Sequence, residues 1–121
     1  QHGDIITKVI ISQRNSSQMG YQKWSVRKSV DFPLISFAIR IDTDNDSIEQ
    51  IRIVVSVLGS KAKEVQGLQN FCGKPSPSLP EEIAKKVQEQ CKPLPNVYYD
   101  PEYRHHLLGI LVKRKMKELV L

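Results

Sequence analysis

Two segments of the chain alternate apolar and polar side chains with a period of two, which predicts β-strands with one buried face. They lie at 35–41 and 51–57, and the polar run DTDNDS at 42–47 between them is typical of a hairpin loop. We therefore expect an antiparallel pair of strands that sends every second side chain into the core. The inward positions are Ile35, Phe37, Ile39 and Ile41 in the first strand, and Ile51, Ile53, Val55 and Val57 in the second.

The first third of the chain predicts two further strands. In residues 5–11, Ile5, Thr7, Val9 and Ile11 alternate with Ile6, Lys8 and Ile10, which predicts a short N-terminal strand buried on most sides. Residues 12–19 are polar and predict a loop, and 21–26 is expected to add a third strand to the sheet. The Asp-Phe-Pro run at 31–33 suits a strand start, because proline cannot donate to a ladder in the middle of a sheet.

The second half of the chain predicts helices. A short helix at 65–72 is expected to end at Gly73. A second helix, at 79–91, follows Ser78, which has the spacing of a capping box with Glu81. Between these helices, and again at 92–95, prolines mark connectors.

The last helix begins at Asp100-Pro101-Glu102, where the carboxylate of Asp100 can accept from free first-turn amides and proline suits the first helical position. The order of strands followed by helices predicts an α+β fold. It is a three-stranded antiparallel sheet plus a short N-terminal strand, covered on one face by three helices, in a single domain spanning 1–121. The apolar positions of the last helix are Tyr103, Leu107, Leu108, Leu111, Val112, Met116 and Leu119.

The bulk composition is that of one ordinary globular domain. The 121 residues suffice for one two-layer core, and 40% are hydrophobic and 26% charged. No apolar run approaches the roughly 18 residues that a membrane span needs, and no signal peptide is visible. We expect a cytoplasmic protein without a membrane partner. Since the sequence does not begin with Met, we expect a fragment or a processed chain.

Two cysteines, Cys72 and Cys91, are too few for an iron–sulfur cluster, which takes about four. Cys91 shares the apolar stripe of its helix with Ile83, Ala84 and Val87, so we expect a buried core thiol. A disulfide between the two cysteines stays open, although a reducing cytoplasm argues against it.

The net charge of +5 is concentrated near the end of the last helix, at Lys113, Arg114, Lys115 and Lys117. Cations there complement the negative end of the helix dipole. A nucleic-acid interface would also need exposed aromatic residues or a recognisable reader motif, and the sequence has neither. We therefore expect no nucleic-acid partner.

Residues suited to metal binding or catalysis are scarce. Asp42, Asp44 and Asp46 have the spacing that opens a calcium loop, but Ser47 stands in place of the turn glycine and Ile53 in place of the closing glutamate. The adjacent histidines at 105–106 point in different directions on one helix and cannot share a metal. No nucleophile elbow, P-loop or dinucleotide fingerprint occurs, so we expect no metal site and no free-standing enzyme.

Four segments of the chain, taken in order, match one family pattern. They are GDIITKVIIS at 3–12, GYQKWSVRKSVDFPLISFAIRI at 20–41, IEQIRIVVSVLGS at 48–60 and LPNVYYDPEYRHHLLGILVKR at 94–114, with the Tyr103-Arg104 pair. Together they resemble the closing domain of the flavoprotein subunits of molybdenum hydroxylases, a family that includes xanthine dehydrogenase, carbon monoxide dehydrogenase and 4-hydroxybenzoyl-CoA reductase. The chain departs from the family's pattern at Gly59-Ser60, where Gly-Gly is usual, and in the shortened segment 61–65.

The resemblance implies that segment 21–31 approaches the isoalloxazine ring of FAD. Tyr21 would then cover a flavin face, while Lys23, Arg27 or Lys28 would stabilise negative charge near the ring on reduction. Asp31 would orient one of these cations. Which of the three cations stabilises the negative charge near the ring stays open. Without the resemblance, the segment would be interpreted as a solvated edge of the sheet.

The function implied by the resemblance is that of the C-terminal domain of the FAD subunit, which closes over the flavin and docks partner subunits in electron transfer. FAD would be held by an N-terminal FAD domain, and the molybdenum cofactor and iron–sulfur clusters by a molybdenum subunit and an iron–sulfur subunit. This domain alone would be inactive and bind no cofactor. The alternative is a small basic module that binds an acidic protein or nucleic acid through its last helix.

Overall fold

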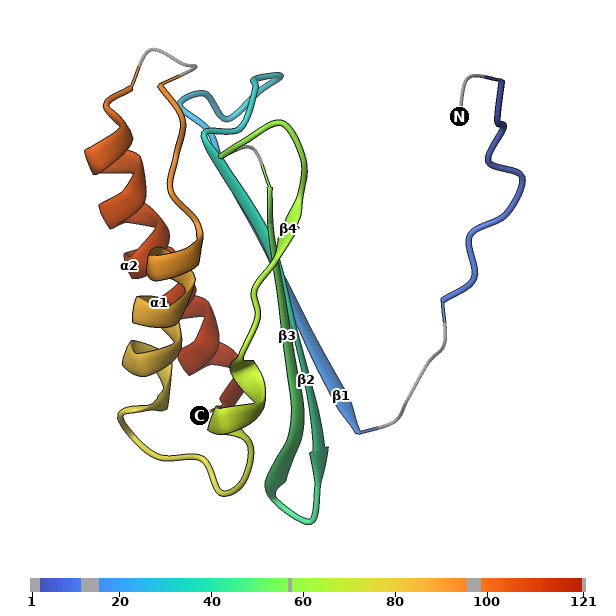
Figure 1. Cartoon of the computed structure of the whole chain (residues 1–121), viewed down its shortest axis with the longest axis vertical. Helices are drawn as coiled ribbons and strands as arrows, with labels where there is room; N and C mark the ends of the chain where they lie inside the picture. Colours follow the sequence, from blue (N-terminus) through green and yellow to red (C-terminus); the bar gives the residue numbers. More distant parts are fainter. Residues whose placement is uncertain (1–2, 12–15, 57, 96–98, 121) are drawn as a thin grey trace.

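The computed structural model of the chain describes residues 3–11, 16–56, 58–95 and 99–120 and has two layers, a sheet and a pair of helices (Figure 1). The antiparallel sheet has the order β1-β2-β3-β4, and both α-helices pack on one of its faces. This arrangement confirms the predicted α+β class. The elements are β1 (Ser17–Trp24), β2 (Ile35–Asp44), β3 (Ser47–Ser56), β4 (Lys63–Glu64), the 3₁₀ helix η1 (Leu68–Phe71), α1 (Leu79–Gln90) and α2 (Pro101–Val120).

The β2–β3 hairpin is the centre of the sheet and follows the predicted alternation. Phe37 pairs with Val55 and Ile39 with Ile53, and all four side chains are buried. Both strands run further than expected and meet at a tight turn in which Asn45 has a φ of 46° and Asp46 a φ of 61°. Asparagine and aspartate tolerate this left-handed backbone, which matches the twist of the strands. The inward face is therefore as predicted, apart from Val57, which lies outside the described residues.

The predicted N-terminal strand is wrong. Residues 3–11 form no strand, and their apolar side chains face solvent, with Ile6 85% exposed. Figure 1 shows this segment standing apart from the two layers. Instead, β1 begins at Ser17, inside the segment expected to be a loop, and the remaining strand of the sheet is the short β4 on the other side of β3. Alternation predicted a strand at 5–11, but a strand needs a partner, and residues 3–11 pair with no strand among the described residues.

The predicted third helix is also wrong, because 65–72 contains only the single 3₁₀ turn of η1. The amide of Val65 still donates to the carbonyl of Ile53 (2.9 Å), so the chain is extended there. Gly67 has a φ of 76°, and Gly73 bridges back to Ile48. Between these fixed points too few residues remain for an α-helix.

The two α-helices begin and end near their predicted positions. The carboxylate of Asp100 accepts from the amide of Glu102 (3.0 Å), as expected for the start of α2. The predicted capping box of α1 does not form. Ser78 donates to Glu82 (2.6 Å), while Glu81 accepts from Lys113 of α2 (3.0 Å), and this hydrogen bond lowers the pKa of Glu81.

α1 and α2 approach each other closely at Gly109. A Cβ placed there would lie 2.5 Å from the side-chain amide of Gln88, so only glycine fits without displacing that side chain. The amide of Gln88 donates to the carbonyl of His105 (2.9 Å), and the His105 ring contacts the Gln88 carbonyl (2.8 Å). His106 is exposed, in keeping with the expectation that the two histidines do not act together.

The cysteines behave as core residues. Cys91 is buried beside Val87, and burial raises the pKa of its thiol. Cys72 is half-buried, and both thiols are free, so the disulfide does not form. No helix among the described residues is long and apolar enough to cross a membrane.

Arg104 is the most unusual residue of the core, because its side chain is fully buried. Its Nε and Nη2 donate to the carbonyl of Leu34 (3.3 and 3.2 Å), and its Nη1 donates to the carbonyl of Leu94 (3.0 Å). Desolvation lowers the pKa of Arg104, although a guanidinium stays charged in proteins. The side chain thus joins α2 to the start of β2 and to the connector that leaves α1.

Replacing Arg104 by methionine should destabilise the domain by about 3 kcal/mol or more, because the carbonyl of the buried Leu34 loses two donors and that of Leu94 loses one. Urea denaturation followed by circular dichroism measures the free energy of unfolding. The matched control is Arg114→Met on the exposed face of α2, which should stay within about 0.5 kcal/mol of the original chain. Equal losses in both variants would contradict a special role for the buried guanidinium.

Candidate functional site

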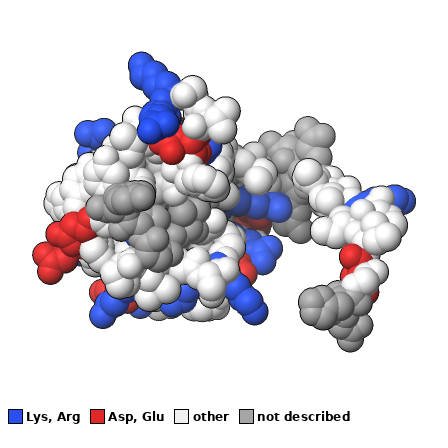
Figure 2. Space-filling model, turned by 90° about the horizontal axis from the view of Figure 1, so that it is seen from above, with Lys and Arg blue, Asp and Glu red and all other residues white. Residues whose placement is uncertain are grey.

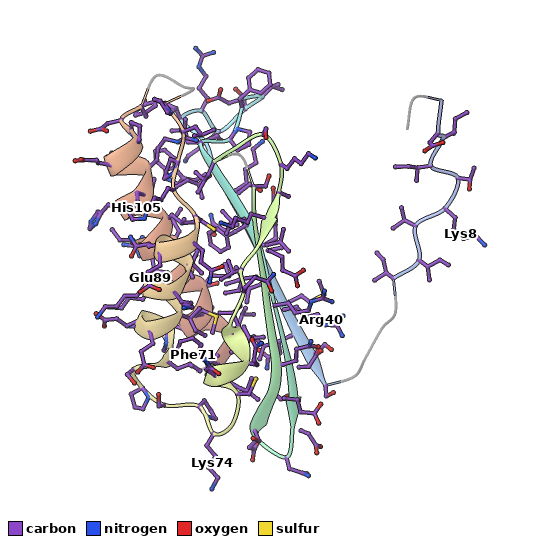
Figure 3. The ribbon with its side chains drawn as sticks, in the orientation of Figure 1. Lys8, Arg40, Phe71, Lys74, Glu89 and His105 are labelled. Atoms are coloured by element: carbon purple, nitrogen blue, oxygen red, sulfur yellow. The ribbon has the colours of Figure 1, made fainter. Side chains whose placement is uncertain are left out.

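The predicted site residues of β1 lie on the face of the sheet that the helices leave uncovered. Tyr21 pairs with Ala38 and Lys23 with Ser36, whereas the alternate residues pair with the core-facing Ile39, Phe37 and Ile35. Tyr21 is 62% exposed, and its hydroxyl accepts from Ser36 (3.1 Å). Figure 3 shows Arg40, on the neighbouring strand, projecting away from the helices to the same side. The ring of Tyr21 is thereby held by its hydroxyl and open to a ligand.

Cations on this open face differ in how they are neutralised. Arg40 pairs with Asp42 (2.9 Å), and Arg52 pairs with Glu64 (2.9 Å). Lys23 is exposed and has no carboxylate partner among the residues that the structure describes. Of the charges on this face, that of Lys23 is therefore the most available to an anionic group.

Arg27, Lys28 and Asp31 lie in the loop 25–33, which joins β1 to β2. Both cations are exposed. The carboxylate of Asp31 accepts from the amides of Arg27 (3.0 Å) and Phe32 (2.9 Å), so its contacts are with the loop backbone. This geometry holds the loop in shape and leaves the two cationic side chains pointing outward.

The loop is closed at its base by a hydrogen bond from the Leu34 amide to the Trp24 carbonyl (2.8 Å). Since Tyr21 and Lys23 are near the C-terminal end of β1 and the other three residues are in the loop that follows, all five predicted residues lie toward one end of the sheet. Figure 2 looks onto this end of the molecule, and its Lys and Arg side chains are interspersed with acidic ones instead of forming one patch.

The same loop contains exposed apolar residues that the sequence analysis did not single out as functional. Val30 is 98% exposed, Phe32 90% and Val26 54%. The signal available in the sequence was three apolar residues in a short charged segment without a strand or helix period. Phe32 had been assigned to the start of a strand, but β2 begins only at Ile35.

The remaining candidates do not form sites. Asp42 is buried and accepts from Ser17 and from Arg40, while Asp44 and Asp46 are exposed at the turn. No three His, Cys, Asp or Glu side chains of the described residues could hold a metal. A cleft of about 610 Å³ lies along β3, but the Arg52–Glu64 ion pair and side-chain amides line it, without a nucleophile and base in contact.

The basic cluster of α2 is partly neutralised. Lys113 pairs with Glu81 (3.0 Å), and Lys115 pairs with Glu118 (2.5 Å). Only Arg114 and Lys117 of the four cations are exposed without such a pair among the described residues. This weakens the alternative of a basic module that binds through its last helix.

A family model matches residues 21–119 of the chain, and it describes the CO dehydrogenase flavoprotein C-terminal domain. The chain belongs to this family. The match begins at Tyr21 and includes the whole candidate site, and it confirms the resemblance found in the sequence. No curated protein matches the chain at the sequence level.

Solved structures share the fold at low sequence identity. A carbon monoxide dehydrogenase from Hydrogenophaga pseudoflava, which lacks the Mo-pyranopterin moiety of the molybdenum cofactor, has a TM-score of 0.78 and 15% identity over 89% of this chain and 38% of that chain. Quinoline 2-oxidoreductase from Pseudomonas putida 86 has a TM-score of 0.75 and 17% identity over 87% of this chain and 37% of that chain. The chain thus spans about 38% of the first matched structure.

The candidate site suits a flat ring that gains negative charge on reduction better than a phosphate group. It offers exposed aromatic rings at Tyr21 and Phe32 and cations without carboxylate partners among the described residues. A pyrophosphate would need a glycine-rich loop at a helix N-terminus, and α1 and α2 begin instead with acidic residues in their first turns. These residues therefore fit one wall around a flavin ring.

Replacing Asp31 by alanine should loosen the loop, because the amides of Arg27 and Phe32 lose their acceptor. Trypsin cleaves after Arg27 and Lys28, so limited digestion should release the two fragments several-fold faster, while the free energy of unfolding falls by only about 1 kcal/mol. Asp44→Ala, at the exposed β2–β3 turn, is the control and should leave the cleavage rate unchanged. Unaltered cleavage in Asp31→Ala would mean that the carboxylate does not hold the loop.

Proposed function

We propose that this chain is the C-terminal domain of the FAD-carrying subunit of a molybdenum-dependent oxidoreductase and forms one wall of the flavin site. The observation that carries the proposal is the open sheet face at Tyr21 and Lys23, an exposed ring beside a cation without a carboxylate partner among the described residues, in a chain of this flavoprotein family. Two of the structures that share this fold are carbon monoxide dehydrogenases of the molybdenum-cofactor type, which supports the same class of parent enzyme.

In this proposal, an N-terminal FAD domain of the same subunit binds the parts of FAD that this domain does not contact. Two facts support it. The chain spans about 38% of the first matched structure, and residues 3–11 expose apolar side chains along a segment that leaves the domain. Such a segment gains stability when it pairs with a strand edge elsewhere in the subunit.

In this proposal, FAD supplies the electron-transfer chemistry, between a molybdenum subunit and an iron–sulfur subunit on one side and an acceptor on the other. The domain supplies side chains that surround the flavin ring. Tyr21 lies against the ring, and Lys23, Arg27 or Lys28 stabilises the negative charge that the ring gains on reduction. Asp31 holds the loop that carries two of these cations in a single shape.

The isolated domain should bind FAD weakly or not at all, since it offers one wall of the site and no cradle for the phosphates. Equilibrium dialysis against free FAD tests this, with riboflavin as the control ligand that lacks phosphates. A complex of micromolar or higher affinity would show that the cofactor contacts have been misplaced.

In the full subunit, Lys23→Ala, Arg27→Ala and Lys28→Ala should identify the cation that faces the ring. Loss of about 1.5 kcal/mol of charge stabilisation would lower the two-electron midpoint potential of the flavin by about 30 mV. Spectroelectrochemical titration measures the potential, with Lys74→Ala at the opposite end of the domain as control.

The same substitutions in the isolated domain should change the free energy of unfolding by no more than about 0.5 kcal/mol, because all three side chains are exposed. An unchanged flavin potential in all three variants would make the segment a solvated edge of the sheet. A full subunit that carries no flavin, as read from its absorption spectrum, would contradict the proposal as a whole.

A further inference from the structure

The loop 25–33, named here the docking loop, contains three exposed large apolar side chains. Val30 and Phe32 are almost entirely exposed, and Val26 is more than half exposed. Single exposed apolar residues are ordinary on protein surfaces, but three within seven residues form a patch that marks an interaction site. Arg27 and Lys28 lie within the same patch.

The docking loop is nevertheless well built. The Leu34–Trp24 hydrogen bond closes its base (2.8 Å), the carboxylate of Asp31 accepts from two of its amides, and Ser25 donates to the carbonyl of Arg27 (3.0 Å). The exposure of its apolar side chains is therefore a feature of an ordered loop. A surface that is presented in one conformation loses little conformational entropy when a partner covers it.

We propose that the docking loop inserts its apolar side chains into a socket on another part of the same parent polypeptide, an apolar surface bordered by carboxylates. This inference rests on the proposed function, because it requires a longer subunit around the domain. It adds a protein partner to a loop that the proposed function uses for its cations.

The chemistry of the loop indicates a protein surface as the occupant. Valine side chains offer aliphatic surface on all sides, and a flat ring can cover one side chain but not three that are spread over seven residues. A concave apolar surface covers them all. Arg27 and Lys28 have no carboxylate partner among the described residues, so the border of the socket should supply acidic groups.

The same polypeptide is favoured over a separate one because about 62% of the first matched structure lies outside the region that this chain covers, which follows from 100% minus the covered 38%. A tethered surface meets the loop at a high effective concentration, so a patch of three side chains and two cations suffices. An independent partner would need a larger interface.

The test uses the full-length subunit that contains this chain, with Val30 replaced by the photo-crosslinking residue p-benzoylphenylalanine. After irradiation, mass spectrometry maps the linked residues. The control places the same residue at Lys74, which is exposed in the connector before α1, far from the loop (Figure 3). We expect a crosslink from position 30 to residues of the same polypeptide outside this domain, several-fold above position 74 and independent of protein concentration.

A second variant tests the charged border of the socket. Lys28→Glu, added to the position-30 protein, should lower the crosslink yield several-fold, whereas Lys74→Glu should leave it unchanged. The proposal is overturned by a yield no higher than that of the control position. It is also overturned by linkage to the flavin or to another subunit, and by a yield that rises with protein concentration, as expected for a second copy.

Failure of the inference and failure of the proposed function can be told apart in the same samples. A crosslinked subunit without flavin would retain the docking loop and refute the flavin site. A flavin potential that responds to Lys23→Ala, without a crosslink from position 30, would support the flavin site and refute the docking loop.

Discussion

The arrangement of the two layers depends on the buried guanidinium of Arg104. A cation without access to water is costly unless its donors are satisfied, and Arg104 directs three of them to the carbonyls of Leu34 and Leu94. These carbonyls belong to segments without a regular strand or helix partner, so each needs a donor as much as the cation needs acceptors. Lysine could not replace the planar fork, because its single nitrogen cannot serve two separated carbonyls in fixed directions. The burial of the Arg104 guanidinium and its hydrogen bonds to the two carbonyls therefore depend on each other.

The hydrogen bonds of Arg104 also position the candidate site. Leu34, whose carbonyl Arg104 holds, donates its amide to Trp24 at the end of β1. The ring of Trp24 packs edge-on against Tyr103, the neighbour of Arg104 in α2, with ring centroids 6.4 Å apart. The end of β1, the base of the docking loop and the first turn of α2 are thus one packed unit. The outward side chains of the loop lie on a rigid base, which suits a surface that must meet a cofactor and a partner in a defined geometry.

Local patterns in the sequence predicted what local physics determines. The β2–β3 hairpin follows from alternation and turn residues, and the start of α2 from Asp100 and Pro101. Residues 5–11 misled because alternation says that a segment can be a strand but not where its partner is. The prediction of a capping box was wrong because Lys113, which is distant in sequence, donates to the carboxylate of Glu81. Tyr21 and Lys23 were predicted through a family resemblance. The exposure of Phe32 was missed, because three-dimensional burial decides which apolar residues remain outside the core.

Two exposed apolar segments, 3–11 and the docking loop, distinguish this domain from a self-contained one. They differ in the step at which each loses conformational entropy. The docking loop is ordered by its own hydrogen bonds when the domain folds, so contact with a partner can use most of its apolar surface for affinity. Residues 3–11 form no strand within the described part of the chain, so their backbone would lose entropy only when they pair with an edge elsewhere. The loop can therefore specify the geometry of the contact, and the extended segment can add backbone hydrogen bonds once that geometry is set.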